Sequence, residues 1–280
     1  MTDLVLNDAE KIPGRSKRNV LLDIEHGVAT ITFNRPEAKN SLDVEALEEF
    51  FEALGTAEDR VDVGAVVLTG AGDAFCAGVN LKGYAIEDRD ALRAGFREVA
   101  MWWHQALHRL VRMPKPVLAA VNGIAVGGGL GMVLASDMAV CNERASFYAS
   151  WMSNGMANDG GSSYTLVKIV GMRRAMELML TNKTLSAQEA LEWGIVNRLY
   201  RQDEFDRNVK QIARDLADGP THLQAMVKET FHDGWRRSIE ECTEHECMNI
   251  LKALDHPYGR ERLGAFLRGE RTNKLKVRLP

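Results

Sequence analysis

Apolar and polar residues alternate in two short runs near the start of the chain, at Val20–Ile24 and Val28–Phe33. A period of two is typical of a half-buried strand, and the intervening Glu25-His26-Gly27 can form a turn, so the pattern predicts a β-hairpin. Three later apolar runs have no polar interruption and predict strands that are buried on both faces. These runs are Val63–Leu68, Pro116–Val121 and Met138–Cys141.

Helical periodicity fills the intervals between these strands. Asp43 is placed to cap a helix whose apolar stripe includes Leu47 and Phe50, and a long helical pattern runs from Asp88 to Met113. Strands that alternate with helices predict an α/β fold.

The pattern of alternating strands and helices ends at Asp203. From there to about Arg268 every segment is helical, with breaks at Gly219-Pro220 and His256-Pro257. We therefore expect three parts: a flexible tail at 1–18, an α/β core at 19–202 and a C-terminal helical subdomain at 203–280.

Composition and charge narrow the function. Hydrophobic residues make up 45% and charged residues 26% of the 280 positions, which excludes a disordered chain. With 35 Lys and Arg against 39 Asp and Glu, the net charge is −4, which argues against nucleic acid as a partner. An anionic ligand would have to be held by local charges. Four scattered cysteines, and the lack of an apolar stretch long enough for a signal peptide or a membrane span, favour the cytoplasm without a membrane partner.

Residues 127–131 read Gly-Gly-Gly-Leu-Gly, between a predicted strand and an apolar helical segment. Glycines at such a place let a ligand approach the backbone, and a helix N-terminus presents unpaired N–H groups. The run could bind an anion or polarise a carbonyl oxygen. A crowded strand-to-helix turn would also need small residues, and the run alone does not separate the two interpretations.

His104 and His108 lie one turn apart in the long helical pattern and resemble the histidine pair of a zinc-protease helix. Gln105 occupies the position of the glutamate base and no third ligand is evident, so we expect no metal. Phe96 and Trp103 share a helical face beside His104. An imidazole there could act as a base near neutral pH, and a packed histidine on an amphipathic helix is the alternative.

Asp159 lies in a glycine-rich segment just before another helical run. On composition alone, a helix N-cap or turn carboxylate is the favoured role. The neighbouring serines lack the nucleophile-elbow spacing, which argues against a serine hydrolase. Spacing does not show whether His104 and Asp159 meet.

Several segments together resemble the crotonase (enoyl-CoA hydratase/isomerase) superfamily, in order and at family spacing over about residues 20–270. They are NRPEAKNSL at 34–42, LTG at 68–70, AFCAGVNL at 74–81, and KPVLAAVNG at 115–123 followed by the glycine run.

This resemblance implies a spiral of ββα units whose C-terminal helical subdomain forms a homotrimer or a dimer of trimers. It also implies an acyl-CoA thioester as substrate, with coenzyme A as part of the substrate and no separate cofactor. By the same resemblance, the backbone N–H groups of Val79 and Gly128 would bind the thioester oxygen. Lys39, Lys82 and Ala77 match positions that bind the CoA.

Within the superfamily the chain is most similar to the 4-chlorobenzoyl-CoA dehalogenases. The matching segments include WWHQ at 102–105, LASDM at 134–138 and IVGMRRAMELMLTN at 169–182. The two glutamates of the hydratases correspond here to Gly131 and Trp151, neither of which can act as an acid or base. Ordinary hydration of an enoyl-CoA is therefore excluded by the resemblance.

The resemblance implies hydrolytic dehalogenation of a 4-halobenzoyl-CoA. Asp159 would attack the ring carbon that carries the halogen, and Trp151 would orient its carboxylate. His104 would then activate water to hydrolyse the aryl ester. Phe96 and Trp103 would line the ring pocket. Val79 stands where these dehalogenases usually carry Phe, which enlarges the pocket and leaves the backbone donor intact.

Two other functions stay open. One is another crotonase reaction, like that of an enoyl-CoA hydratase/isomerase or a naphthoyl-CoA synthase. The other is a catalytically silent CoA-binding protein, against which the presence of both His104 and Asp159 argues.

Overall fold

The structure is a computed structural model that describes residues 18–270, so the expected tail at 1–18 lies outside the described residues except for Arg18. The larger of its two sheets has the strand order β1-β2-β3-β5-β7-β10, and only its β1-β2 pair, the predicted hairpin, is antiparallel. Its strands are β1 (Val20–Glu25), β2 (Val28–Phe33), β3 (Ala65–Gly70), β5 (Val117–Val121), β7 (Met138–Asn142) and β10 (Arg198–Tyr200).

A second, four-stranded sheet has the order β4-β6-β8-β9 and is parallel except for β8 and β9. Its strands are β4 (Ala74–Cys76), β6 (Ile124–Val126), β8 (Ser146–Tyr148) and β9 (Thr184–Ser186). The hydrophobic pattern did not predict any of them, because three residues are too few to establish a period of two.

The helices connect the two sheets in a regular way. The units β3-β4-α2, β5-β6-α3 and β7-β8-α4 each place their first strand in the larger sheet and their second in the smaller one. This is the predicted spiral of ββα units. The helices are α1 (Val44–Asp59), α2 (Arg89–Arg112), α3 (Gly128–Ala135), α4 (Ser162–Thr181), α5 (Ala187–Glu192), α6 (Gln202–Ala217), α7 (Thr221–Gly234), α8 (Ile239–Asp255) and α9 (Pro257–Leu267).

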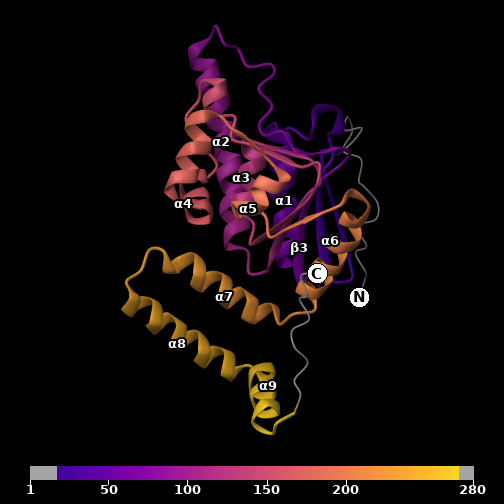
Figure 1. Cartoon of the computed structure of the whole chain (residues 1–280), viewed down its shortest axis with the longest axis vertical. Coiled ribbons are helices and arrows are strands. Elements are labelled where there is room, and N and C mark those ends of the chain that lie inside the picture. The colour runs from indigo at the N-terminus through magenta and orange to yellow at the C-terminus, as the bar shows by residue number, and fades with distance from the viewer. Residues whose placement is uncertain (1–17, 271–280) are drawn as a thin grey trace.

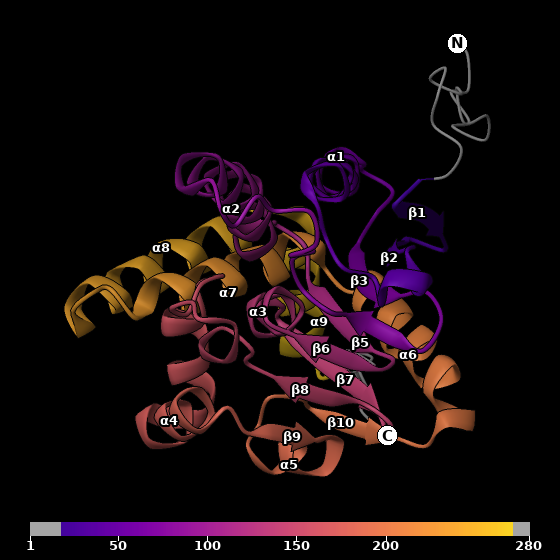
Figure 2. The ribbon, with the colours of Figure 1, turned by 90° about the horizontal axis from the view of Figure 1, so that it is seen from above.

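Helices cover both faces of the larger sheet (Figure 2). In β3, Val66 and Leu68 pack into the core that includes α1, α2 and α3. Ala65 and Val67 alternate with them and pack into a smaller core with Phe205 and other residues of α6. Burial on both faces explains why this strand reads as an uninterrupted apolar run.

The last three helices leave the α/β body. Figure 1 shows α7 and α8 side by side beneath the core, with α9 folded back at the end of α8. The breaks predicted at Gly219-Pro220 and His256-Pro257 are present, and a further break at 235–238 separates α7 from α8. No helix between residues 18 and 270 is both long enough and apolar enough to cross a membrane.

Candidate active site

A cavity of about 720 Å³ opens between the segment after β4, the middle of α2, the start of α3 and the loop before α4. All but one of the predicted site residues line it. They are Ala77, Val79, Lys82, Phe96, Trp103, His104, Gly128, Trp151 and Asp159. The exception is Lys39.

His104 and Asp159 meet in this cavity although 55 positions separate them in the sequence. The imidazole Nε2 lies 2.7 Å from the Asp159 Oδ1 atom, and the two side chains are 45% and 44% exposed. A base and a carboxylate in direct contact, both open to the cavity, can serve as a nucleophile and the group that activates water.

Asp159 is not a helix cap. The N-cap of α4 is Gly161, which makes no side-chain cap, and Asp159 contributes only its backbone oxygen, to the Ser162 N–H at 3.2 Å. Gly160 and Gly161 both have positive φ, +65° and +67°, so two left-handed residues turn the chain between Asp159 and α4. The turn leaves the carboxylate facing the cavity.

Trp151 lines the same cavity and is buried. Among the described residues, no hydrogen bond joins its indole to Asp159, whose carboxylate pairs with His104 instead. The predicted orienting bond is thus absent in this state, although the second carboxylate oxygen of Asp159 could accept it without loss of the His104 contact.

Two backbone N–H groups without an acceptor among the described residues belong to cavity-lining residues beside the start of α3. Gly128 is the first residue of α3, so its N–H has no acceptor within the helix. Val79 forms an isolated parallel bridge with Leu42 that uses the Gly78 oxygen and the Asn80 N–H, and leaves the Val79 N–H unused. A Cβ on Gly78 would come within 3.1 Å of the Gly128 nitrogen, so the two segments are in close contact. Paired donors at a helix N-terminus can hold a carbonyl oxygen that gains negative charge.

Aromatic side chains form the wall next to His104. Trp103 is 2% exposed, and its indole lies against Gly128, Gly131 and Gly160. Phe96 lies two turns earlier on α2 and packs on Tyr84, with ring centroids 4.6 Å apart. A flat ring fits between such surfaces.

The predicted lysines differ in their surroundings. The Lys39 Nζ atom lies 2.8 Å from both oxygens of Asp73, outside the cavity. Lys82 lies at the exposed rim, where its backbone N–H donates to Asn80 Oδ1. It would hold an anion without first leaving a partner, whereas Lys39 must give up Asp73.

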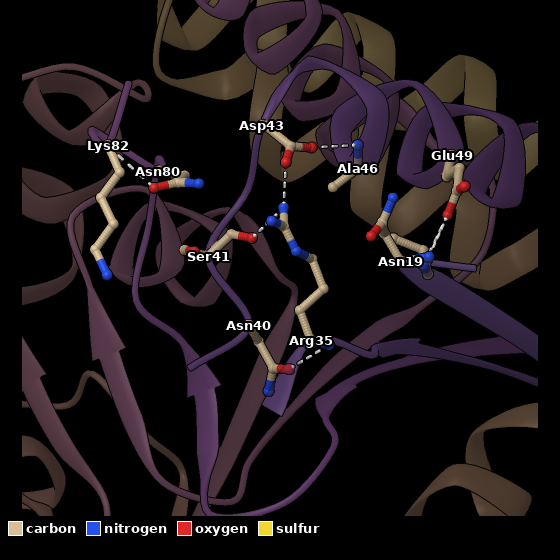
Figure 3. A network of polar contacts seen from close by, with 10 residues as sticks. Asn19, Arg35, Asn40, Ser41, Asp43, Ala46, Glu49, Asn80 and Lys82 are labelled. Carbon is tan, nitrogen blue, oxygen red and sulfur yellow. Dashed lines mark hydrogen bonds and ion pairs between the residues drawn. The ribbon is translucent and has the colours of Figure 1, made fainter. Parts of the chain in front are cut away.

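A polar network fixes the loop that precedes α1 (Figure 3). The Arg35 guanidinium binds the N-cap Asp43 and the Ser41 carbonyl, and the Asn40 Oδ1 accepts the Arg35 N–H at 2.9 Å. Because Ser41 lines the cavity, the network positions one of its walls. Sequence reasoning assigned a role only to Asp43, as the cap of this helix, and the structure confirms it.

Cysteine chemistry does not belong to this site. Cys76 lies just before the Val79 segment, where its Sγ accepts the Gly78 N–H at 3.3 Å. Complete burial raises the pKa of this thiol to about 12, so it stays protonated near neutral pH.

Several cavity residues were missed in the sequence, most plainly Val99 and Ala100. They lie at i+3 and i+4 from Phe96 and share its face of α2, so helical spacing could have found them. Ser150, Asn154 and Met156 come from a loop without periodicity, where the sequence holds no such signal.

The chain matches the model of the enoyl-CoA hydratase/isomerase family over residues 23–272. It is 48% identical to 4-chlorobenzoyl coenzyme A dehalogenase-2 from Arthrobacter sp. over 92% of this chain and 95% of that protein. It is 31% identical to 1,2-epoxyphenylacetyl-CoA isomerase from Escherichia coli over 79% of this chain and 84% of that protein. Among solved structures, an enoyl-CoA hydratase from Bacillus anthracis matches with a TM-score of 0.83 and 29% identity, over 90% of this chain and 97% of that one.

Proposed function

Because this chain belongs to the enoyl-CoA hydratase/isomerase family, it is an acyl-CoA enzyme, and we propose that it hydrolytically dehalogenates 4-halobenzoyl-CoA to 4-hydroxybenzoyl-CoA. The observation that carries this proposal is the contact between His104 Nε2 and Asp159 Oδ1 in a cavity that also holds the free donors of Val79 and Gly128. The 48% identity to a 4-chlorobenzoyl-CoA dehalogenase over nearly the whole chain supports the same substrate class.

In the first step an Asp159 carboxylate oxygen attacks the ring carbon that carries the halogen. The electron pair moves through the ring to the thioester oxygen, where the Val79 and Gly128 N–H groups and the positive end of α3 stabilise it. The carbon–halogen bond then breaks, halide leaves with its electron pair, and an aryl ester remains on Asp159. The thioester must be ortho or para to the halogen, because only from these positions does the carbonyl oxygen share the charge, and in the proposed 4-halo substrate it is para.

In the second step His104 accepts a proton from water while the water oxygen attacks the ester carbonyl of Asp159. The acyl–oxygen bond breaks, which returns the carboxylate and releases the phenol. The hydroxyl oxygen of the product therefore comes from Asp159, and the water oxygen stays in the carboxylate. Phe96, Trp103 and Trp151 exclude bulk water from the ring during this sequence.

The decisive experiment follows halide and 4-hydroxybenzoyl-CoA during incubation with 4-chlorobenzoyl-CoA. We expect Asp159→Asn to release neither product, and His104→Gln to release about one chloride per site while the aryl ester accumulates as added mass on the protein. Asp206→Asn, on the outer surface of α6, is the matched control and should keep full activity. A wild-type protein that releases no chloride would contradict the proposal and leave only the family assignment.

An isotope experiment tests the route of the oxygen. In a single turnover in H₂¹⁸O we expect unlabelled 4-hydroxybenzoyl-CoA and one ¹⁸O in Asp159, located by digestion and mass spectrometry. Label in the phenol on the first turnover would show direct attack of water on the ring and would reject the ester.

We further propose that the chain forms a homotrimer or a dimer of trimers through its C-terminal helices. These helices carry exposed apolar side chains, and a groove of about 820 Å³ between α4 and α7 holds neither His104 nor Asp159. The exposed side chains include Val227, Phe231, Trp235, Ile250, Phe266 and Leu267. Sedimentation equilibrium should give three or six times the chain mass of 31.1 kDa, and a monomer or dimer would contradict the assignment.

A further inference from the structure

A second cavity, of about 280 Å³, lies on the far side of His104, between α2, the start of α4 and α7. His104 is the only residue among those described that lines both this cavity and the candidate active site. The imidazole therefore lies at the boundary between the two cavities. Three of the chain's seven histidines line the second cavity: His104, His108 and His232. One of them, His108, has no role in the proposed reaction.

The imidazoles are arranged from the interior towards solvent. His104 and His108 lie one turn apart on α2, with ring centroids 6.5 Å apart and planes inclined by 27°. That separation is too long for a direct hydrogen bond and leaves room for a bridging water. His108 is exposed, so a proton that reaches its ring can pass to bulk solvent.

The third histidine completes the opposite wall. His232 comes from α7, with its Nε2 atom 3.6 Å from Asp137 Oδ1, and its backbone oxygen accepts the Tyr164 hydroxyl at 3.2 Å. Asp137 in turn pairs with Lys228, 2.8 Å away. His232, on the wall of the cavity, is thus linked through Asp137 to the α/β core.

Other charges face the cavity from the helices that form it. Arg112 follows His108 by one turn of α2, and Asp233 and Arg236 come from α7 and its C-terminal end. The Arg236 and Asp233 side chains pair at 2.7 Å, so the net charge of these three is positive. Asp159 faces His104 from the active-site side.

The proposed hydrolysis needs a water to enter and a proton to leave. Conversion of an aryl chloride and water into a phenol and chloride releases one proton in each turnover, and His104 receives that proton first. Once the substrate fills the active-site cavity, its aromatic walls and the CoA separate His104 from solvent on that side. His104 must therefore exchange protons with solvent through the second cavity.

We propose that the second cavity supplies the hydrolytic water and carries the proton from His104 through a bridging water to His108 and then to solvent. The inference rests on the proposed function. His108 touches no reacting atom; it acts through His104 as a positioning and relay residue. Water enters by the same path, which keeps the ring pocket dry while the ester is hydrolysed.

The test compares the two chemical steps in single turnover. We expect His108→Gln and His108→Ala to release chloride at the wild-type rate and to hydrolyse the ester about tenfold more slowly, below the 10²–10⁴-fold typical of losing a general base itself. Added imidazole should restore hydrolysis in His108→Ala, because it can occupy the vacated space beside His104. His26→Asn, in the exposed β1-β2 turn, is the control and should change neither step.

Wild-type hydrolysis rates in both His108 variants, or an equal loss of both steps that imidazole does not rescue, would overturn the relay. If the wild-type protein releases no chloride, the proposed function fails first. The cavity is then tested by NMR titration of the imidazoles: a His108→Gln substitution that leaves the titration of His104 unchanged would overturn the coupling.

Discussion

Gly160 directly follows Asp159 and lies against the Trp103 indole. Its φ of +65° disfavours any side chain, and a Cβ there would lie 2.9 Å from Trp103 Nε1. The next residue, Gly161, has nearly the same φ of +67° but no atom within 4 Å of its Cβ position. The pair therefore separates backbone strain from a steric clash.

We expect Gly161→Ala to lower the free energy of unfolding by about 1 kcal/mol, the cost of a left-handed Ala. Gly160→Ala should cost about 1–3 kcal/mol more, because it also displaces Trp103. Only the second variant should lose chloride release, since it moves the wall beside Asp159. Urea unfolding and the chloride assay measure both effects, and equal losses in the two variants would show that Trp103 is free to move.

Lys82 makes a different kind of contribution, through charge at the rim of the cavity. Its ammonium group makes no ion pair among the described residues, whereas Lys39 is held by Asp73. We expect Lys82→Ala to raise KM for the CoA substrate about fivefold with little change in kcat, because a phosphate contact binds ground state and transition state alike. Lys39→Ala should have a smaller effect. A fall in kcat at constant KM would contradict a role in CoA binding.

At the level of single residues, sequence reasoning found most of the cavity because the crotonase resemblance assigns positions one by one. Spacing could not show that His104 meets Asp159, since the two lie 55 positions apart in different ββα units, and only the resemblance implied that they act on one ester. Residue chemistry alone favoured a cap for Asp159. The structure gives that place to Gly161, because two left-handed glycines already turn the chain into α4.

A buried ion pair fastens α7 to the core. The Lys228 ammonium, 8% exposed, lies 2.8 Å from Asp137 Oδ2 and donates to the carbonyls of Leu110 and Lys115. Burial lowers the pKa of Lys228, and the nearby Asp137 carboxylate opposes that shift. The same Asp137 oxygen accepts the Val117 N–H of β5 at 2.8 Å, so one carboxylate connects the helix to the sheet.

We expect Lys228→Met to destabilise the docking of α7 by about 3–5 kcal/mol, because it leaves the Asp137 charge without its partner. Hydrogen exchange should increase throughout α7 and much less in β3. Lys252→Met, on the exposed surface of α8, is the matched control. Asp137→Asn in the Lys228→Met background should restore part of the loss, and no restoration would mean that packing of the Lys228 stem holds the helix.

At the level of elements, five strands of the larger sheet and the C-terminal helices were predictable because their apolar patterns extend over enough residues, whereas β10, with three residues, was not predicted. The strands of the smaller sheet are three residues long, and β6 reads as part of the glycine turn that follows it. The ββα spiral brings β4, β6 and β8 side by side, and β9 then pairs antiparallel with β8. That information is global, so no local pattern contains it.

Two cysteines bury their thiols in the interior of the molecule and couple its stability to alkaline pH. Burial raises the pKa of both Cys76, on β4, and Cys141, on β7, to about 12 from a usual value of 9.0. The folded state keeps these protons while the unfolded chain loses them. The stabilisation is complete below pH 9 and declines as the pH rises towards 12.

For each buried thiol, stability should therefore fall by about 1.4 kcal/mol between pH 8 and pH 10, because pH 10 lies about one unit above the pKa of cysteine in the unfolded chain. Lys228 acts in the opposite sense, because its lowered pKa makes stability rise with pH towards 10.5. Because Lys228 is present in the wild-type protein and in the cysteine variants, its contribution cancels when the pH slopes of their stabilities are compared. Over this interval, the free energy of unfolding of Cys141→Ala, measured in urea under reducing conditions, should fall by about 1.4 kcal/mol less than that of the wild-type protein. Cys247→Ala, which removes an exposed thiol, should keep the wild-type slope. Equal slopes in all three proteins would mean that the interior opens to hydroxide before the chain unfolds.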